Sequence, residues 1–432
     1  MNRLPLVTFF LLFVSLSAFA EEQTRESIAG GELRQETAYR FASPADFGKI
    51  KQTARLDLKF NINPVFKIKL GGRVFYDAVY DLTDQYPEDV NENMRKEALL
   101  RDAYLNISLS QVNIRLGHQQ IVWGESLGQF FADVVTPKDF REFFLPDFED
   151  LRLPIWALDV QYNFLPDVTL EAVISPDQTV NKFALPGADF AFSLPAPAGV
   201  DVALLPDDKP DTDFKHWNGG FKLSWLIKGW DIAGFYYTSP DHIPALFKTV
   251  SVDPATGRTV LTLDPQHRRV HHHGFTFSKG VGPTIVKGEF VYTRNRFFNA
   301  EDVTQNEGLL RRGQLRYMVG VDYTIGGKVD MNGEFQQEIT FASRRDLSDQ
   351  VLRSWIFLRF ETGFFDEKLV PELTFILGLD SGDTMVNPNL TYNPKRWLQF
   401  IWGAYLFSGP NDQLYGQFDS KDRVYMTTRF LF

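Results

Sequence analysis

The sequence predicts an all-β protein, a transmembrane antiparallel β-barrel of about eighteen strands with short periplasmic turns and long extracellular loops. Three observations predict this fold. Apolar and polar side chains alternate over most of the chain, short and long connections alternate between the segments, and after residue 20 no run of about 18 apolar residues could form a membrane helix. Phe, Trp and Tyr make up 15% of the residues although the mean hydropathy is negative, which indicates that apolar side chains are interleaved with polar ones.

The first twenty residues have the pattern of a secretory signal peptide. Arg3 provides the positive charge, residues 4–17 are mainly apolar, and Ala18-Phe19-Ala20 forms a small-x-small cleavage site. We therefore expect residues 1–20 to be a cleaved signal, residues 21–31 a short periplasmic segment, and residues 32–432 the barrel.

Charge and cysteine content exclude several classes of protein. Cleavage of the signal peptide would remove one of the 45 basic residues. The remaining 44 stand against 55 acidic residues, which gives a net charge of −11. This acidic balance argues against a nucleic-acid partner. The chain has no cysteine, which excludes a disulfide framework, a thiolate metal site and a cysteine nucleophile.

Alternation with a period of two residues marks the expected strands, and segment 311–325 shows it over a length that could cross a bilayer. In this segment Leu315, Tyr317, Val319, Val321, Tyr323 and Ile325 alternate with Gln314, Arg316, Met318, Gly320, Asp322 and Thr324. The complete set of expected spans is 32–42, 49–60, 63–80, 97–109, 111–123, 153–164, 167–176, 214–226, 229–239, 267–279, 283–296, 311–325, 328–342, 350–363, 367–380, 383–392, 396–408 and 421–432.

The connections support the same topology, because outer-membrane barrels have short periplasmic turns and longer extracellular loops. Short connections occur at 61–62, 110, 165–166, 227–228 and 326–327, and long ones at 81–96, 124–152, 177–213, 240–266 and 297–310. An even count with both ends in the periplasm requires 383–392 to be a separate strand, which favours eighteen strands. Sixteen remains the alternative, because the first strand and the strand near Asn387 have the weakest patterns.

The chain ends in an alternating segment, residues 423–432, whose last residue is Phe432. A terminal strand ending in an aromatic residue resembles the signal recognised by the outer-membrane barrel assembly machinery. We therefore expect two partners, this machinery and the lipid of a Gram-negative outer membrane.

If apolar side chains face lipid, the alternate positions face the lumen, and their charges separate by strand. The expected basic wall consists of Arg55, Lys59, Lys67, Lys69, Arg73, Arg115, Arg423 and Arg429. The expected acidic wall consists of Asp322, Asp330, Glu334, Glu338, Glu361, Glu372 and Asp380. Two walls of opposite sign would orient dipolar or zwitterionic solutes. The alternative is that these charges pair across neighbouring strands and stiffen the wall.

The connection 124–152 carries both acidic and aromatic residues. Its acids are Glu125, Asp133, Asp139, Glu142, Asp147, Glu149 and Asp150, and its aromatics include Phe130, Phe131, Phe140, Phe143, Phe144 and Phe148. We expect this loop to fold inward against the basic wall and to form a constriction, because its aromatic side chains would otherwise meet water. The alternative is an ordinary loop that covers the mouth of the barrel.

No motif points to catalysis, a metal or a cofactor. On a strand His271 and His273 could share one face while His272 points to the other, which makes a metal site a minority interpretation. Asp147, Glu149 and Asp150 suggest calcium less readily than a solvated acidic loop. We expect no enzyme, no cofactor and no metal.

Several segments together resemble a known family. They are Arg115–Glu125, Asp133–Glu142, Leu145–Pro154, Tyr39–Ala42, Tyr76–Leu82, Phe407–Gly409 and Gln417–Phe418. They look like a proteobacterial outer-membrane family catalogued only as a domain of unknown function, and the resemblance covers most of the mature chain. It implies an outer-membrane barrel without an established substrate, and genes of this family often accompany exporters of the resistance-nodulation-division type. It supplies no catalytic residues, and this chain is shorter than many members.

The expected function is a porin-like channel for small organic solutes. The alternative is an accessory component that exports apolar molecules or lipids alongside an inner-membrane exporter of the resistance-nodulation-division type. A side opening lined by Phe would favour that alternative, and a lumen filled by its own side chains would favour an adhesin or structural barrel.

Overall fold

The structure is a computed structural model that describes residues 29–193, 199–302 and 306–432. The expected signal peptide, residues 1–20, lies outside the described residues, as do residues 21–28 of the expected periplasmic segment.

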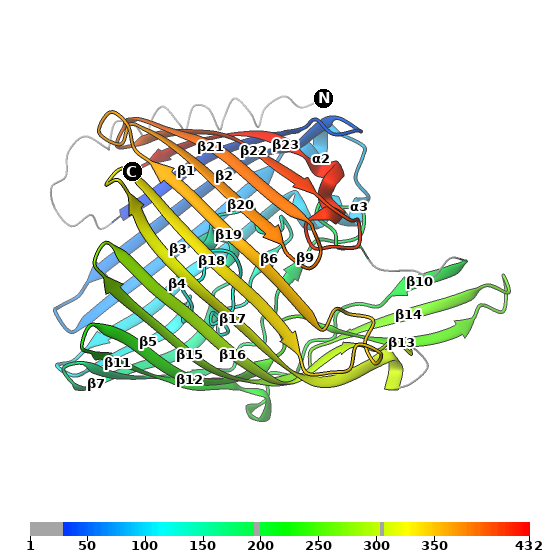
Figure 1. Ribbon diagram of the computed structural model, residues 1–432, viewed down its shortest axis with the longest axis horizontal. Coiled ribbons are helices and arrows are strands. Elements are labelled where there is room, and N and C mark those ends of the chain that lie inside the picture. The colour runs from blue at the N-terminus through cyan, green and yellow to red at the C-terminus, as the bar shows by residue number, and fades with distance from the viewer. Residues whose placement is uncertain (1–28, 194–198, 303–305) are drawn as a thin grey trace.

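Eighteen antiparallel strands form one closed barrel, as the sequence predicts (Figure 1). They are β1 (Ala29–Arg40), β2 (Asp46–Asn61), β3 (Phe66–Asp77), β4 (Lys96–Ser108), β5 (Val112–Gln119), β7 (Ile155–Leu165), β8 (Val168–Ser175), β11 (Asn218–Ile227), β12 (Trp230–Pro240), β15 (Arg269–Val281), β16 (Thr284–Asn299), β17 (Leu309–Ile325), β18 (Val329–Thr340), β19 (Leu352–Thr362), β20 (Leu369–Gly378), β21 (Thr384–Lys395), β22 (Leu398–Ser408) and β23 (Arg423–Leu431). Each strand pairs with the next along the barrel, and β23 closes the sheet by pairing with β1 from Glu32 opposite Leu431 to Arg40 opposite Arg423.

The strand count is eighteen because β21 is a strand of its own, as the alternation of connections requires. Some expected boundaries were wrong. The expected strand 111–123 ends at Gln119, and the segment 63–80 is not a single strand. The strand β3 ends at Asp77 and the short helix α2 (Val79–Leu82) follows. Val79 and Tyr80 continue the apolar pattern but are buried against Val90 and Ala188, so their hydrophobicity reflects packing of a loop.

The outward faces of the strands carry exposed apolar side chains, as a lipid-facing surface requires. On β17, for example, Val319, Tyr323 and Ile325 are all exposed, whereas Met318 on the other face is buried. The predicted alternation along this strand is thus confirmed. Among the described residues, no helix is both long enough and apolar enough to cross a membrane.

Further elements lie in the long connections. They are α3 (Glu88–Met94), β10 (Val200–Leu204), β13 (Ala245–Val252), β14 (Thr259–Gln266) and the 3-10 turns η2 (Phe214–His216), η3 (Asn306–Gly308) and η4 (Gly416–Lys421). The strands β10, β14 and β13 form a small sheet that projects beyond the barrel at the right of Figure 1. The sequence pattern did not separate these strands from loop, since they lie outside the barrel's lipid-facing alternation.

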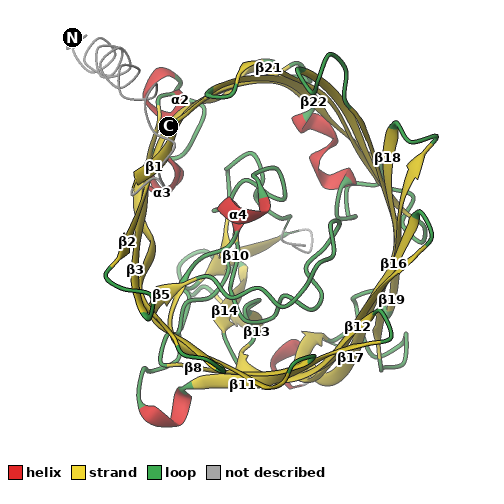
Figure 2. Cartoon of the chain, turned by 90° about the vertical axis from the view of Figure 1, so that its left-hand side faces the viewer, coloured by secondary structure: helices red, strands yellow, loops and turns green. Residues whose placement is uncertain are grey.

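Segments of two long connections lie inside the barrel. Residues 120–154 contain β6 (Asp139–Phe140) and α4 (Phe148–Leu151), and Figure 2, which looks into one end of the barrel, shows α4 within the ring of strands. β6 pairs in parallel with β9 (Lys182–Phe183), which belongs to the following connection, residues 176–217. The two connections are therefore joined to each other as well as to the wall.

Where these connections meet the wall, the lumen side of the strands is apolar. Trp355 and Phe357 share their face of β19 with the lumen residue Arg359, yet they pack with Phe143 of the inward connection and with Phe418. The expectation that polar residues line the whole lumen fails here. The inward connections replace water at these positions, so burial of apolar side chains becomes favourable.

Candidate functional site: the lumen crossed by an inward-folded connection

The connection 120–154 first attaches to the wall through residues 124–132, which we call the N-terminal limb. Glu289 of β16 accepts hydrogen bonds from the backbone N–H groups of Glu125, Ser126 and Ala132, the last two at 2.9 Å. Burial of a carboxylate is costly unless it is hydrogen-bonded, and here the loop backbone supplies the donors. Glu289 thus fixes the course of the main chain.

A second carboxylate binds the same limb. Glu334 of β18 accepts hydrogen bonds from Leu127 N at 3.0 Å and from the Ser126 hydroxyl at 2.9 Å, and it lies 3.3 Å from the Lys287 ammonium. The carboxylates of Glu289 and Glu334 come from strands separated only by β17, and both residues are 2% exposed. The N-terminal limb is therefore attached through its backbone to β16 and β18.

Apolar packing supports this attachment. Trp123 lies between the rings of Phe235 and Tyr237, at centroid distances of 5.3 and 5.7 Å, and its indole N–H donates to Glu171 at 2.9 Å. Phe131 is 1% exposed in the same apolar cluster. The limb is thus buried on one side of the lumen.

The later part of the connection, residues 139–151, reaches the wall formed by β1 to β4 and β23, and we call it the C-terminal limb. Asp150 ion-pairs with Arg34, with Arg73 at 2.8 Å and with Arg101 at 3.7 Å. Burial by itself would raise the pKa of Asp150, but Arg34 and Arg73 outweigh this effect and hold the pKa below its usual range. Asp150 therefore stays ionised among three guanidinium groups.

Two further acids of the C-terminal limb reach the same wall. Asp147 lies 2.5 Å from Arg429 and 3.4 Å from Arg34, and Glu149 lies 2.5 Å from Arg55. Asp147 and Glu149 are about half exposed, with side-chain exposures of 53% and 54%. We call the guanidinium groups that meet the three acids the arginine cluster: Arg34, Arg55, Arg73, Arg101 and Arg429.

Glu142 also forms ion pairs with the wall, but its partners are lysines instead of arginines. Its two carboxylate oxygens bind Lys49 and Lys51 of β2. Burial would raise the pKa of Glu142, but the two lysines more than compensate and hold the pKa well below its usual range. The C-terminal limb is therefore attached by side-chain ion pairs, in contrast to the N-terminal limb.

In the other inward connection, one carboxylate binds several cations of the barrel. Asp189 lies 2.7 Å from Arg40, 2.8 Å from Arg423 and 3.4 Å from Lys421. Its neighbour Phe190 packs on Phe418 at a centroid distance of 5.3 Å. Ion pairs and aromatic packing together keep this connection against β1 and β23.

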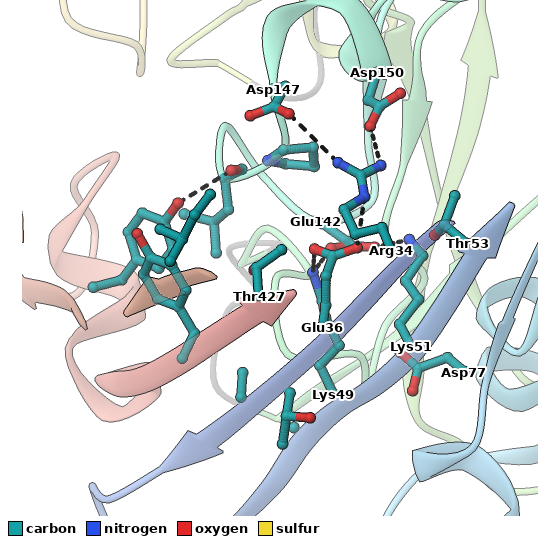
Figure 3. A pocket seen from close by; sticks show the side chains of 18 of the residues that line it. Arg34, Glu36, Lys49, Lys51, Thr53, Asp77, Glu142, Asp147, Asp150 and Thr427 are labelled. Atoms are coloured by element: carbon teal, nitrogen blue, oxygen red, sulfur yellow. Dashed lines mark hydrogen bonds and ion pairs between the residues drawn. The ribbon is translucent and has the colours of Figure 1, made fainter. Parts of the chain in front are cut away.

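Between the C-terminal limb and the wall lies a cavity of about 420 Å³, shown in Figure 3. Its wall side includes Arg34, Lys49, Lys51 and Thr53, and its loop side includes the acids Glu142, Asp147 and Asp150. Ion-paired basic and acidic groups thus border a space of small-molecule size.

The residues of the expected basic wall divide into three groups. Arg55, Arg73 and Arg429 bind the C-terminal limb, as described above. Arg115 pairs with Asp159 at 2.5 Å, Lys69 with Asp102 at 2.8 Å and Arg423 with Asp189. Lys59 and Lys67 are exposed at the ends of β2 and β3 that face their short turn.

The residues of the expected acidic wall are also largely engaged by neighbouring groups. Asp322 lies 3.1 Å from Lys287, Asp330 accepts from the Thr324 hydroxyl at 2.7 Å, and Glu338 stands opposite Arg316 and Arg353 in register. Glu361 and Glu372 both bind Arg359. Asp380 lies beyond the end of β20 and is exposed, so its assignment to the strand wall was wrong. Most of these acidic side chains therefore interact with neighbouring groups of the wall.

The acids of the connection 124–152 fall into two sets. Glu142, Asp147, Glu149 and Asp150 bind the basic side of the barrel. Asp133 pairs with Lys138 and Arg152 inside the connection, Asp139 pairs with Arg141, and the Glu125 side chain is exposed.

Sequence reasoning missed several residues of the site. Lys49 and Lys51 have the same parity on β2 as Arg55 and could have been found by extending that alternation. Arg101 could not, because the register shift between Gly71 and Gly72 against β4 puts it outside the simple alternation. Glu289 looks like any other lumen-side acid until the loop backbone is placed against it.

The described residues contain no group of three or more His, Asp or Glu side chains arranged to hold a metal ion. His271 and His273 both contact the ring of Tyr236, whereas His272 is buried and 3.0 Å from the Thr293 hydroxyl. The three histidines therefore do not converge.

The closed sheet with an apolar exterior defines the class of the protein, an eighteen-stranded outer-membrane β-barrel. The chain belongs to the family described as "Protein of unknown function (DUF1302)", which matches residues 47–418. A comparison with curated proteins finds no match.

Several solved structures share the fold. OccK2 (OpdF) of Pseudomonas aeruginosa, solved in complex with glucuronate, is 11% identical with a TM-score of 0.54. OccAB3 of Acinetobacter baumannii is 10% identical with a TM-score of 0.53, and the outer membrane protein opdK of P. aeruginosa is 10% identical with a TM-score of 0.51. Each alignment covers 94% of this chain and 98% of the other. The similarity establishes the barrel fold. A closed antiparallel sheet with an apolar exterior is the structure of a protein of the Gram-negative outer membrane.

Proposed function

We propose that the protein is an outer-membrane channel for small polar organic solutes, narrowed by the connection 124–152. The observation that carries this proposal is that one connection contacts two opposite parts of the wall. Its N-terminal limb binds Glu289 and Glu334, and its C-terminal limb binds Arg34 and Arg73. A segment held on both sides must cross the lumen and reduce the open section.

The residues that line the cavity favour polar solutes over apolar ones. The cavity is bordered by lysines, arginines and carboxylates, whereas the aromatic cluster around Phe143 and Phe418 is packed shut, with exposures of 0% and 1%. Facing basic and acidic groups can orient a charged or zwitterionic solute. A polar ligand, glucuronate, is bound in the similarly folded OccK2 structure.

Single-channel recording of the purified protein in planar bilayers tests the proposal. We expect steady ohmic steps, and deletion of residues 130–148 should increase the conductance because it removes most of the crossing segment. A matched control is deletion of residues 253–258, the turn of the projecting β13–β14 hairpin, which should leave the conductance unchanged. Silence of correctly folded protein would contradict the channel, and an unchanged current after the first deletion would contradict the constriction.

We also propose that β23 is recognised by the barrel assembly machinery through the strand end at Phe432. Its alternating pattern and its position as the closing strand support this partner. Removal of Phe432 should lower the yield of folded barrel in the outer membrane, measured by heat-modifiable gel migration. An inner-membrane exporter remains a proposed partner, testable by cross-linking in cells, and we propose no catalytic role for the chain.

A further inference from the structure

Five guanidinium groups from different strands converge on one short segment of the C-terminal limb. They are those of the arginine cluster, carried by β1, β2, β3, β4 and β23, and they bind the three acids around α4. Planar guanidinium groups match the geometry of carboxylates, and such charge-assisted contacts are stronger than neutral hydrogen bonds. The wall thus presents a surface suited to carboxylate groups, and the protein's own carboxylates occupy it.

The two sides of this contact differ in their access to water. Arg34, Arg73 and Arg101 are buried, with side-chain exposures of 8%, 8% and 2%. Asp147 and Glu149 are half exposed. Ion pairs with an exposed partner contribute little to stability, so these two carboxylates can be exchanged for others at small cost. The arginines belong to strands of the wall, whereas Glu149 lies in a helix of four residues and Asp147 directly precedes it.

The wall also retains donors that the loop does not use. The Thr53 hydroxyl and the Arg73 Nε, on residues that are 4% and 7% exposed, have no hydrogen-bond partner within the described part of the chain. Both residues line the cavity of about 420 Å³. Buried polar groups are normally paired, so unpaired donors beside a cavity indicate a place for an acceptor from outside the protein.

We propose that the arginine cluster is a binding site for small carboxylate solutes, and that Asp147 and Glu149 of the C-terminal limb occupy it as an internal competitor until such a solute arrives. This inference rests on the proposed channel function and specifies its solute class. An entering carboxylate takes the place of Asp147 at Arg429 or of Glu149 at Arg55, while Asp150 keeps the limb attached to Arg34 and Arg73.

The test uses the purified full-length mature protein and succinate as the probe, with binding measured by calorimetry in detergent. In the double variant Asp147→Asn/Glu149→Gln, Arg55 retains Asp57 and Arg429 retains Glu32, but each loses its loop carboxylate, so succinate binding should tighten by about tenfold. The double variant Arg55→Gln/Arg429→Gln should weaken or abolish binding. The charge-matched control Asp208→Asn/Asp211→Asn, at exposed positions of the connection 176–217, should bind succinate as the original protein does.

A probe of opposite charge separates this site from a general effect of charge. Putrescine has a similar length but two amines, and it should gain no affinity from Asp147→Asn/Glu149→Gln. Equal or weaker succinate binding in that variant, or full binding in Arg55→Gln/Arg429→Gln with correct folding shown by heat-modifiable migration, would overturn the proposal.

Bilayer recording of the same variants distinguishes the two proposals. Ohmic steps that succinate does not interrupt, together with absent binding, would reject the carboxylate site and keep the channel. Tight succinate binding in a protein that passes no current would reject the channel and keep the site.

Discussion

The two limbs of one connection are attached to opposite walls by different chemistry. The N-terminal limb, residues 124–132, gives its backbone N–H groups to the buried acids Glu289 and Glu334. The C-terminal limb, residues 139–151, gives its acidic side chains to arginines and lysines, and part of this contact is exposed. The polar part of the first attachment joins wall acids mainly to loop backbone groups. The second depends on the loop's own charges, part of which are exposed, so solutes and salt can compete with it.

The largest effect is expected when the carboxylate that accepts the backbone hydrogen bonds of the N-terminal limb is removed. Glu289→Ala leaves three buried N–H groups without their acceptor, which should destabilise the docked N-terminal limb by about 4 kcal/mol. Hydrogen exchange of residues 124–132 in the folded protein measures the change. Thr276→Ala, opposite Glu289 in register on β15, is the control and should leave this exchange slow.

Unaltered exchange of residues 124–132 in Glu289→Ala would contradict the proposed backbone attachment, because the limb would then be held by packing of Trp123 and Phe131 alone.

A somewhat smaller effect is expected on the other limb. Asp150→Asn keeps the side-chain shape but leaves Arg34, Arg73 and Arg101 without their shared carboxylate, at a cost of about 3 kcal/mol. Hydrogen exchange should accelerate in residues 139–151 and remain slow in residues 124–132. Acceleration of both segments to the same degree would show that the two limbs open as one unit.

Acidification should have little effect on the attachment of the C-terminal limb over a wide pH range. Burial would raise the pKa values of Glu142 and Asp150, but the neighbouring cations outweigh it and the folded values are lowered. Their contribution to stability is therefore present above the ordinary carboxyl range near pH 4 and is lost only as the pH falls through the lowered values. Protection of residues 139–151 against hydrogen exchange, corrected for the intrinsic pH dependence of the exchange rate, should stay constant from pH 7 to about pH 4.5 and fall below that range. Loss of this protection near pH 6 would contradict the assignment of these acids as ion-paired.

The smallest expected effect is that of salt. Raising the ionic strength from 0.1 to 1 M screens the half-exposed pairs Arg55–Glu149 and Arg429–Asp147 by less than about 1 kcal/mol. Exchange of residues 147–149 should rise a few-fold while that of residues 124–132 is unchanged. Equal sensitivity of both segments would remove the distinction between the limbs.

The sequence by itself determined the barrel. Alternation along segments such as 311–325, together with alternating connection lengths, predicts eighteen strands because a period of two places every second side chain in lipid. The same periodicity predicted that Arg55, Arg73 and Glu334 face the lumen, and the acids and aromatics of residues 124–152 suggested that this connection lies inside. These are local properties, which a single strand or loop carries in its own sequence.

Only the tertiary structure decided which charges meet. Asp150 is 116 residues from Arg34, and Glu334 is 207 residues from Leu127, so closing the sheet brings together partners that no local pattern relates. The register shift in β4 brought Arg101 into the cluster, and docking of the loops made the lumen side of Trp355 and Phe357 apolar. The physical reason is that strand periodicity depends on neighbours along the chain, whereas ion pairing and burial depend on how the closed barrel fills its interior.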